Sequence, residues 1–142
     1  MKPSIWLKIA ASLQALGTVF HTLATWNPPS RGPAEVAVFE AMRGYRFEIM
    51  GATRSHWDFY HGYEFSITVI FAMIAVLIWQ LSSLSSSEPD RARPLLITIL
   101  IAQVFLSLIS WTNFFAGPGV MSMLIIICMA VALVSLPRNA DA

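Results

Sequence analysis

The chain has 142 residues, of which 56% are hydrophobic and only 12% are charged, and its formal net charge is +1. A soluble domain normally carries about 25% charged residues, so this composition predicts an integral membrane protein. The near-neutral charge, with no cluster of Lys and Arg, argues against a nucleic-acid partner. Cys128 is the one cysteine, so it has no internal disulfide partner and is expected to act as a small hydrophobic residue.

The first apolar stretch covers residues 5–26 and follows the basic start MKPS. Gln14 and His21 interrupt it and TLA is a poor cleavage site, so a retained helix is favoured over a cleaved signal peptide. Residues 33–43 then combine apolar residues at helical spacing with charged ones, and Gly44 is a plausible stop. This pattern predicts a short amphipathic helix that lies on the membrane surface or caps the bundle, and a plain surface helix is favoured over a moving lid.

Three more apolar segments follow, over residues 55–81, 94–115 and 118–136. About 20 apolar residues cross a bilayer core of about 30 Å, so each is long enough to span it. The stretch SSLSSSEPDRAR predicts a serine-rich turn, Pro94 suits the first turn of a helix, and GPG opens the last segment. The expected fold is all-α: a single membrane domain over residues 1–142, built as an integral membrane antiparallel four-helix bundle with a short amphipathic helix between helices 1 and 2.

The basic residues divide almost evenly between the two sides of the membrane. One side holds Lys2, Lys8, Arg91, Arg93 and Arg138, and the other holds Arg31, Arg43, Arg46 and Arg54. This small excess favours both termini in the cytoplasm.

Polar residues gather at the ends of the segments that antiparallel crossing places on one side. They recur at helical spacing: Gln14, Thr18, His21 and Thr25; Trp57, His61, Glu64 and Thr68; Gln103, Ser107, Ser110 and Asn113; and Ser122. Because polar groups turn away from lipid, these stripes predict a ligand pocket near one membrane face. For Gln14, Thr18, Gln103 and Ser107 taken alone, hydrogen bonding between packed helices is the favoured interpretation.

Glu64 stands at the edge of an apolar run with no Lys or Arg within a helical turn. Its nearest partners on the same face are His61 and Tyr60, and an intramembrane carboxylate is a functional hypothesis by default. A His–Glu pair can pass protons near neutral pH, so the predicted catalytic residues are His61, Glu64, His21 and Tyr60. A purely structural ion pair at Glu64 is the equal alternative. Trp57, Tyr60 and Tyr63 also fit an aromatic belt, and His56 and Asp58 are expected to be solvated.

Three functions fit these residues. The first is binding of a hydrophobic or amphiphilic small molecule, lipid- or quinone-like, with acid–base chemistry; since the chain has no recognised catalytic motif, whether it is an enzyme stays open. The second is ligation of haem or chlorophyll by His21 and His61, or of a metal by these two and Glu64. The third is a non-catalytic accessory subunit of a larger membrane complex, and a homo-oligomer is a further option.

The chain also resembles a group of small bacterial four-helix membrane proteins, loosely the DoxX-like proteins. The resemblance covers most of the chain and depends on a histidine late in the first helix, on RSHWDFYHGYEF and on SWTNFFAGPGV. It implies a four-helix architecture and the bacterial inner membrane. DoxX-like proteins have been linked to quinone or sulfur redox chemistry, but no defined catalytic motif matches here, so no residue role is carried over.

Overall fold

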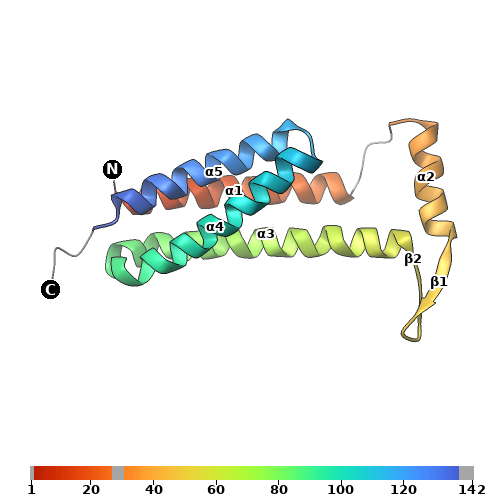
Figure 1. The fold of residues 1–142 in the computed structure, drawn as a ribbon, viewed down its shortest axis with the longest axis horizontal. Helices are drawn as coiled ribbons and strands as arrows, with labels where there is room; N and C mark the ends of the chain where they lie inside the picture. Colours follow the sequence, from red (N-terminus) through yellow and green to blue (C-terminus); the bar gives the residue numbers. More distant parts are fainter. Residues whose placement is uncertain (1, 27–30, 138–142) are drawn as a thin grey trace. The chain divides into compact units, whose positions relative to one another are not determined.

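The computed structural model describes residues 2–26 and 31–137, and most of them are helical (Figure 1). The elements in chain order are α1 (Pro3–Trp26), α2 (Pro33–Gly44), β1 (Arg46–Ile49), β2 (Ala52–Ser55), α3 (His56–Ser87), α4 (Pro89–Asn113) and α5 (Ala116–Ser135). They form two compact units. The first unit comprises residues 1–18 and 71–142, and the second unit comprises residues 19–70.

Three helices are long and apolar enough to cross a membrane, namely α3, α4 and α5. The predicted membrane spans are therefore confirmed, by length and composition, for these three. Helix α1 falls outside this set because Lys8, Gln14 and His21 lower its mean hydropathy. The four-span bundle stays a prediction.

The hydrophobic core of the first unit draws on α1, α3, α4 and α5. Its buried members are Leu7, Ala10, Ala11, Ile78, Leu81, Ala92, Leu96, Ile125, Cys128, Met129, Ala132 and Leu136. Four large side chains in it, Leu7, Ile78, Leu96 and Met129, are completely removed from the surface. Cys128 is a free, buried cysteine within this core, in agreement with its expected role as a small hydrophobic residue.

Helices α4 and α5 approach closely where Gly119 meets Trp111. A Cβ atom at Gly119 would lie 2.6 Å from Cε2 of the Trp111 indole, which is too short for a real contact. At the other end of this helix pair, Nη2 of Arg93 donates to the carbonyl oxygens of Leu136 and Pro137 at 3.2 and 3.1 Å. These bonds supply partners for carbonyls at the end of α5 that have none within the helix.

The predicted serine-rich turn is wrong, because α3 continues to Ser87 and α4 already begins at Pro89. The hydroxyls of Ser82, Ser85 and Ser87 bond carbonyls three or four residues earlier, so serine is satisfied inside the helix. Only Glu88 separates the two helices, and Pro94 lies inside α4 rather than at its start.

A short β-hairpin over residues 46–55 also departs from the all-α expectation. Strands β1 and β2 pair antiparallel, with Phe47 opposite Arg54. Met50 and Gly51, with φ angles of 48° and 80°, make the two-residue turn, whose left-handed backbone is the conformation that tight hairpins favour. Each strand has only four residues, which is too short for its alternation to be read from the sequence.

Aromatic contacts hold α2 and the hairpin against the start of α3 within the second unit. The amphipathic helix predicted over residues 33–43 is confirmed as α2. Its Phe39 ring lies 5.1 Å from the Trp57 ring, and the Arg43 guanidinium lies 3.9 Å above that indole. In the hairpin region, the Tyr45 ring stacks on His56 at 5.7 Å with an interplanar angle of 11°. His56 therefore has an aromatic partner in addition to solvent.

Candidate functional site

The second unit brings the end of α1 beside the beginning of α3 at a cluster of His21, Thr25 and Glu64. Nε2 of His21 lies 3.4 Å from Oε2 of Glu64 and 3.2 Å from its backbone oxygen. The Thr25 hydroxyl donates to the same Oε2 at 3.2 Å. The His21 and Glu64 side chains are each 23% exposed, so the pair is partly buried yet reachable.

The hydrogen bond to the backbone carbonyl of Glu64 constrains one nitrogen of the His21 ring. A carbonyl oxygen only accepts, so this contact requires a proton on Nε2. With that nitrogen directed at Glu64, the second ring nitrogen carries the proton that distinguishes imidazole from imidazolium. A carboxylate that contacts both an imidazole and a hydroxyl is able to hold a proton and to orient a polar group.

Ser55 and Asp58 set the starting point of α3 and thereby the position of Glu64. The backbone N–H of Ser55 donates to Oδ2 of Asp58 at 2.8 Å, and the N–H of Asp58 donates to Oγ of Ser55 at 3.2 Å. This reciprocal pair is a capping box, which satisfies two donors at a helix start. Asp58 is exposed as expected, and in addition it stabilises the helix that carries Glu64.

Thr68 lies one turn after Glu64 in α3, and its Oγ1 is a buried polar atom with no hydrogen-bond partner in the described part of the chain. Other hydroxyls in the helices bond the carbonyl four residues earlier, as Thr98 does to Pro94 at 3.0 Å and Ser110 to Leu106 at 2.8 Å. For Thr68 that carbonyl belongs to Glu64. It already accepts the His21 Nε2 proton in addition to the helical N–H. His21 thus takes the usual partner of the Thr68 hydroxyl.

The structure places His61 and Tyr60 in an aromatic cluster rather than in the His21–Glu64 pair. The His61 ring lies 4.8 Å from the Trp57 ring and 5.2 Å from the Phe65 ring. The Tyr60 ring packs near Trp57 at 5.6 Å. Within residues 2–26 and 31–137, no hydrogen bond or ion pair joins His61 to Glu64, and no group of three or more His, Cys, Asp or Glu residues could hold a metal ion.

The remaining predicted pocket residues belong to the first unit, where buried pairs join different helices. Nε2 of Gln103 donates to Oε1 of Gln14 at 2.7 Å, and the Ser122 hydroxyl bonds that of Ser107 at 2.9 Å. All four side chains are buried. These bonds agree with the interpretation of such residues as contacts between packed helices.

Three further predicted pocket residues make hydrogen bonds within their own helix. The hydroxyls of Thr18 and Ser110 donate to the carbonyls of Gln14 and Leu106, and Asn113 donates to the carbonyl of Ile109. A single pocket formed by the stripes of all four helices stays a prediction.

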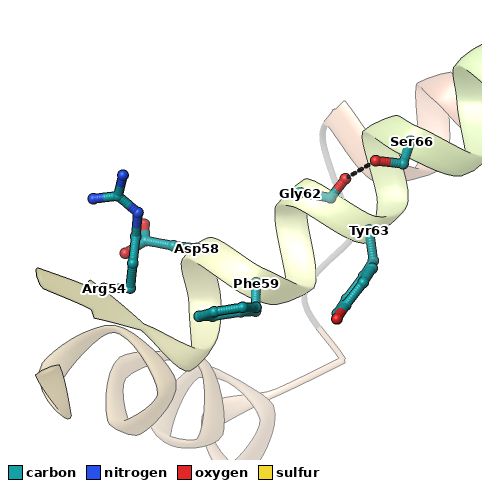
Figure 2. Close-up of a pocket in the computed structure, with 6 residues that line it drawn as sticks. All are labelled: Arg54, Asp58, Phe59, Gly62, Tyr63 and Ser66. Atoms are coloured by element: carbon teal, nitrogen blue, oxygen red, sulfur yellow. Dashed lines mark hydrogen bonds between the residues drawn. The ribbon is translucent and has the colours of Figure 1, made fainter. Parts of the chain in front are cut away.

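Sequence analysis did not predict a second feature of α3, an open depression of about 300 Å3 (Figure 2). It is lined by Arg54, Asp58, Phe59, Gly62, Tyr63 and Ser66. Phe59, Gly62, Tyr63 and Ser66 have the spacing of one helix face, with the glycine between two aromatic residues. This spacing could have indicated the depression from the sequence. The contribution of Arg54 could not, because Arg54 lies in the hairpin, which the sequence analysis did not predict.

Comparisons with known proteins add no relative. No protein-family model, curated protein or solved structure matches the chain.

Proposed function

We propose that the chain is an integral membrane protein whose His21–Thr25–Glu64 cluster, together with the Thr68 hydroxyl, binds the polar group of a hydrophobic or amphiphilic small molecule. A lipid- or quinone-like compound has the required chemistry: an apolar body, and a polar end that exchanges hydrogen bonds with a carboxylate and a hydroxyl. Acid–base chemistry on the bound molecule is the catalytic form of this proposal, with His21 and Glu64 as the groups that exchange the proton.

The unpartnered hydroxyl of Thr68 is the observation that carries this proposal. A buried polar group without a hydrogen bond costs about 1–3 kcal/mol, and more where hydrocarbon replaces water. In the described part of the chain, Thr68 Oγ1 is the buried side-chain oxygen or nitrogen that lacks a partner. It belongs to the same helix face as Glu64, one turn along. A ligand that accepts from Thr68 and contacts Glu64 removes this cost on binding.

The surroundings of the cluster support an amphiphilic ligand. α3 is one of the three helices able to span a membrane, and the cluster lies near its polar beginning. Exposed apolar side chains follow on the same helix, among them Val69 and Ile70. A molecule with a polar head and an apolar tail would match this order of residues.

Ligation of haem, chlorophyll or a metal by His21 and His61 has less support. The Nε2 atom of His21 is engaged with Glu64, and the His61 ring packs against Trp57 and Phe65. A hydrogen bond at one nitrogen of an imidazole is compatible with ligation through the other, so the observation against this alternative is the aromatic packing of His61. The two rings have different surroundings, and neither set of contacts suggests a shared cofactor.

The wider setting is part of the proposal. We propose a four-span arrangement in which α1 joins α3, α4 and α5 in the membrane, in a bacterial inner membrane, with both termini in the cytoplasm. The similarity to DoxX-like proteins suggests the same setting. A homo-oligomer or a larger membrane complex is compatible with the exposed apolar faces of the helices.

Native mass spectrometry of the chain purified in mild detergent tests the proposed binding. We expect a co-purified apolar molecule, and we expect Glu64→Gln to reduce its occupancy at least about tenfold, since a charge-assisted hydrogen bond is lost. Glu48→Gln on the exposed strand β1 is the matched control and should retain the molecule.

A purely structural role of Glu64 predicts a different pattern. Glu64→Gln would then lower thermal stability, while the folded fraction would retain the molecule at wild-type occupancy. That result would contradict the proposed function.

A further inference from the structure

The open depression on α3 is lined by a cation and an anion near the hairpin, and by two aromatic residues, a glycine and a serine (Figure 2). Arg54 and Asp58 line the end near the hairpin, and Gly62, Tyr63 and Ser66 line the part further along the helix. The set shares no residue with the His21–Thr25–Glu64 cluster. It is therefore a separate candidate site.

Strand pairing brings Arg54 to the face of the hairpin that meets α3. Residues directly opposite in an antiparallel pair lie on the same face, and Arg54 is opposite Phe47. The Phe47 ring stacks on Phe59 of α3 at 5.9 Å, so this face of the hairpin is turned toward the helix. Nη1 of Arg54 donates to the Thr53 carbonyl at 3.0 Å, which steadies the guanidinium and leaves its other N–H groups available. Guanidinium groups bind phosphate oxygens in a two-pronged manner.

Asp58 places an anion beside this cation. One of its oxygens, Oδ2, accepts the Ser55 N–H, but a carboxylate has roughly four acceptor positions. Among the residues that line the depression, the charges of Arg54 and Asp58 therefore cancel, and the pair matches a headgroup with one negative and one positive group. A primary ammonium donates hydrogen bonds to a carboxylate, whereas a quaternary ammonium has no N–H with which to do so.

Gly62 lines the depression without a side chain, and the open space left there is called the notch. A Cβ atom at Gly62 would meet no other atom within 4 Å. Phe59 and Tyr63 border this notch and are 37% and 66% exposed, and the Ser66 hydroxyl is turned back to the Gly62 carbonyl at 2.8 Å. Aromatic rings at the start of a membrane-spanning helix lie where lipid headgroups meet acyl chains.

We propose that this depression binds a phospholipid with a zwitterionic headgroup that ends in a primary amine, of the phosphoethanolamine type. Arg54 contacts the phosphate, Asp58 accepts from the ammonium, and the notch at Gly62 receives the glycerol and the first part of an acyl chain. The site is independent of the proposed function, because it uses neither His21 nor Glu64.

The test measures lipid retention by native mass spectrometry after reconstitution in nanodiscs with matched acyl chains. The headgroup is phosphoethanolamine, phosphocholine or phosphoglycerol. We expect one phosphatidylethanolamine to be retained at least about tenfold better than either alternative, and Arg54→Gln to remove most of that preference. Gly62→Leu should fill the notch and reduce retention as strongly, and its Cβ atom would meet no other atom within 4 Å.

Two controls separate this site from general effects. Gly44→Leu, which also adds a side chain in open space but outside the depression, should retain the lipid. Glu64→Gln should also retain it, so loss of the other ligand leaves this result intact. Equal retention of the three headgroups, or a Gly62→Leu variant that binds like the wild type, would overturn the proposal. Preferential retention of the phosphoglycerol lipid would also overturn it. That outcome would mean that Arg54 binds an anionic headgroup without a contribution from Asp58.

Discussion

The two units of the chain differ in the hydrogen bonding of particular buried polar atoms. In the first unit, Gln14 pairs with Gln103 at 2.7 Å and Ser107 with Ser122 at 2.9 Å, so the buried side chains satisfy one another. In the second unit, the buried hydroxyl of Thr68 has no partner among the described residues. Polar spacing alone therefore does not mark a site. A polar group that the protein leaves unsatisfied is the better indication of one.

The largest expected difference between the units concerns their helical glycines. Gly119→Ala in the first unit should lower the free energy of unfolding by about 1–3 kcal/mol, because the new methyl group meets the rigid Trp111 ring. Gly62→Ala in the second unit adds the same methyl group in open space. It should raise the free energy of unfolding by about 0.5–1 kcal/mol through helix propensity.

Denaturant titration in mixed micelles measures both changes. Similar effects of the same sign for the two alanines would contradict the close approach of α4 and α5 at Gly119.

The buried amide pair gives the next largest effect. Gln103→Leu should destabilise the first unit by about 1–3 kcal/mol, because Oε1 of Gln14 loses its donor while it remains buried. Adding Gln14→Leu should restore most of that loss, since two apolar side chains leave no unsatisfied group. A double-mutant cycle measures the coupling.

If each single variant is neutral, the pair does not contribute to packing. A loss of ligand from the double variant would instead place Gln14 and Gln103 in the binding site.

Helical periodicity predicted the long apolar segments and the amphipathic helix α2 because these depend on local spacing. The same reasoning placed Glu64 and His21 among the predicted site residues, and the structure brings these two side chains into contact. It failed for the stretch from Ser82 to Arg93, where serine composition suggested a turn. A serine whose hydroxyl bonds a carbonyl of its own helix cannot be distinguished in the sequence from a serine in a turn.

The role of His61 could not be read from spacing alone. Three residues before Glu64, it shares a face with the carboxylate only approximately, so its neighbours decide where the ring goes. Trp57 and Phe65 lie on the adjacent turns and pack against it. Trp57 in turn is held by Phe39 and Arg43 of α2, and contacts between distant segments are not visible as a pattern in the sequence.

The central claim is that the Thr68 hydroxyl is left without a partner so that it can bind a ligand. A substitution of Thr68, which has the smallest expected effect on stability, tests this claim most directly. Thr68→Val keeps the shape of the side chain and removes the hydroxyl. Thr98→Val, whose hydroxyl bonds Pro94 in its own helix, is the matched control. The measurement pairs the free energy of unfolding of the ligand-free protein with ligand occupancy by native mass spectrometry.

We predict that Thr68→Val raises the free energy of unfolding by about 1 kcal/mol and lowers ligand occupancy several-fold, whereas Thr98→Val changes neither by much. A Thr68→Val variant that is less stable and retains the ligand fully would contradict the account.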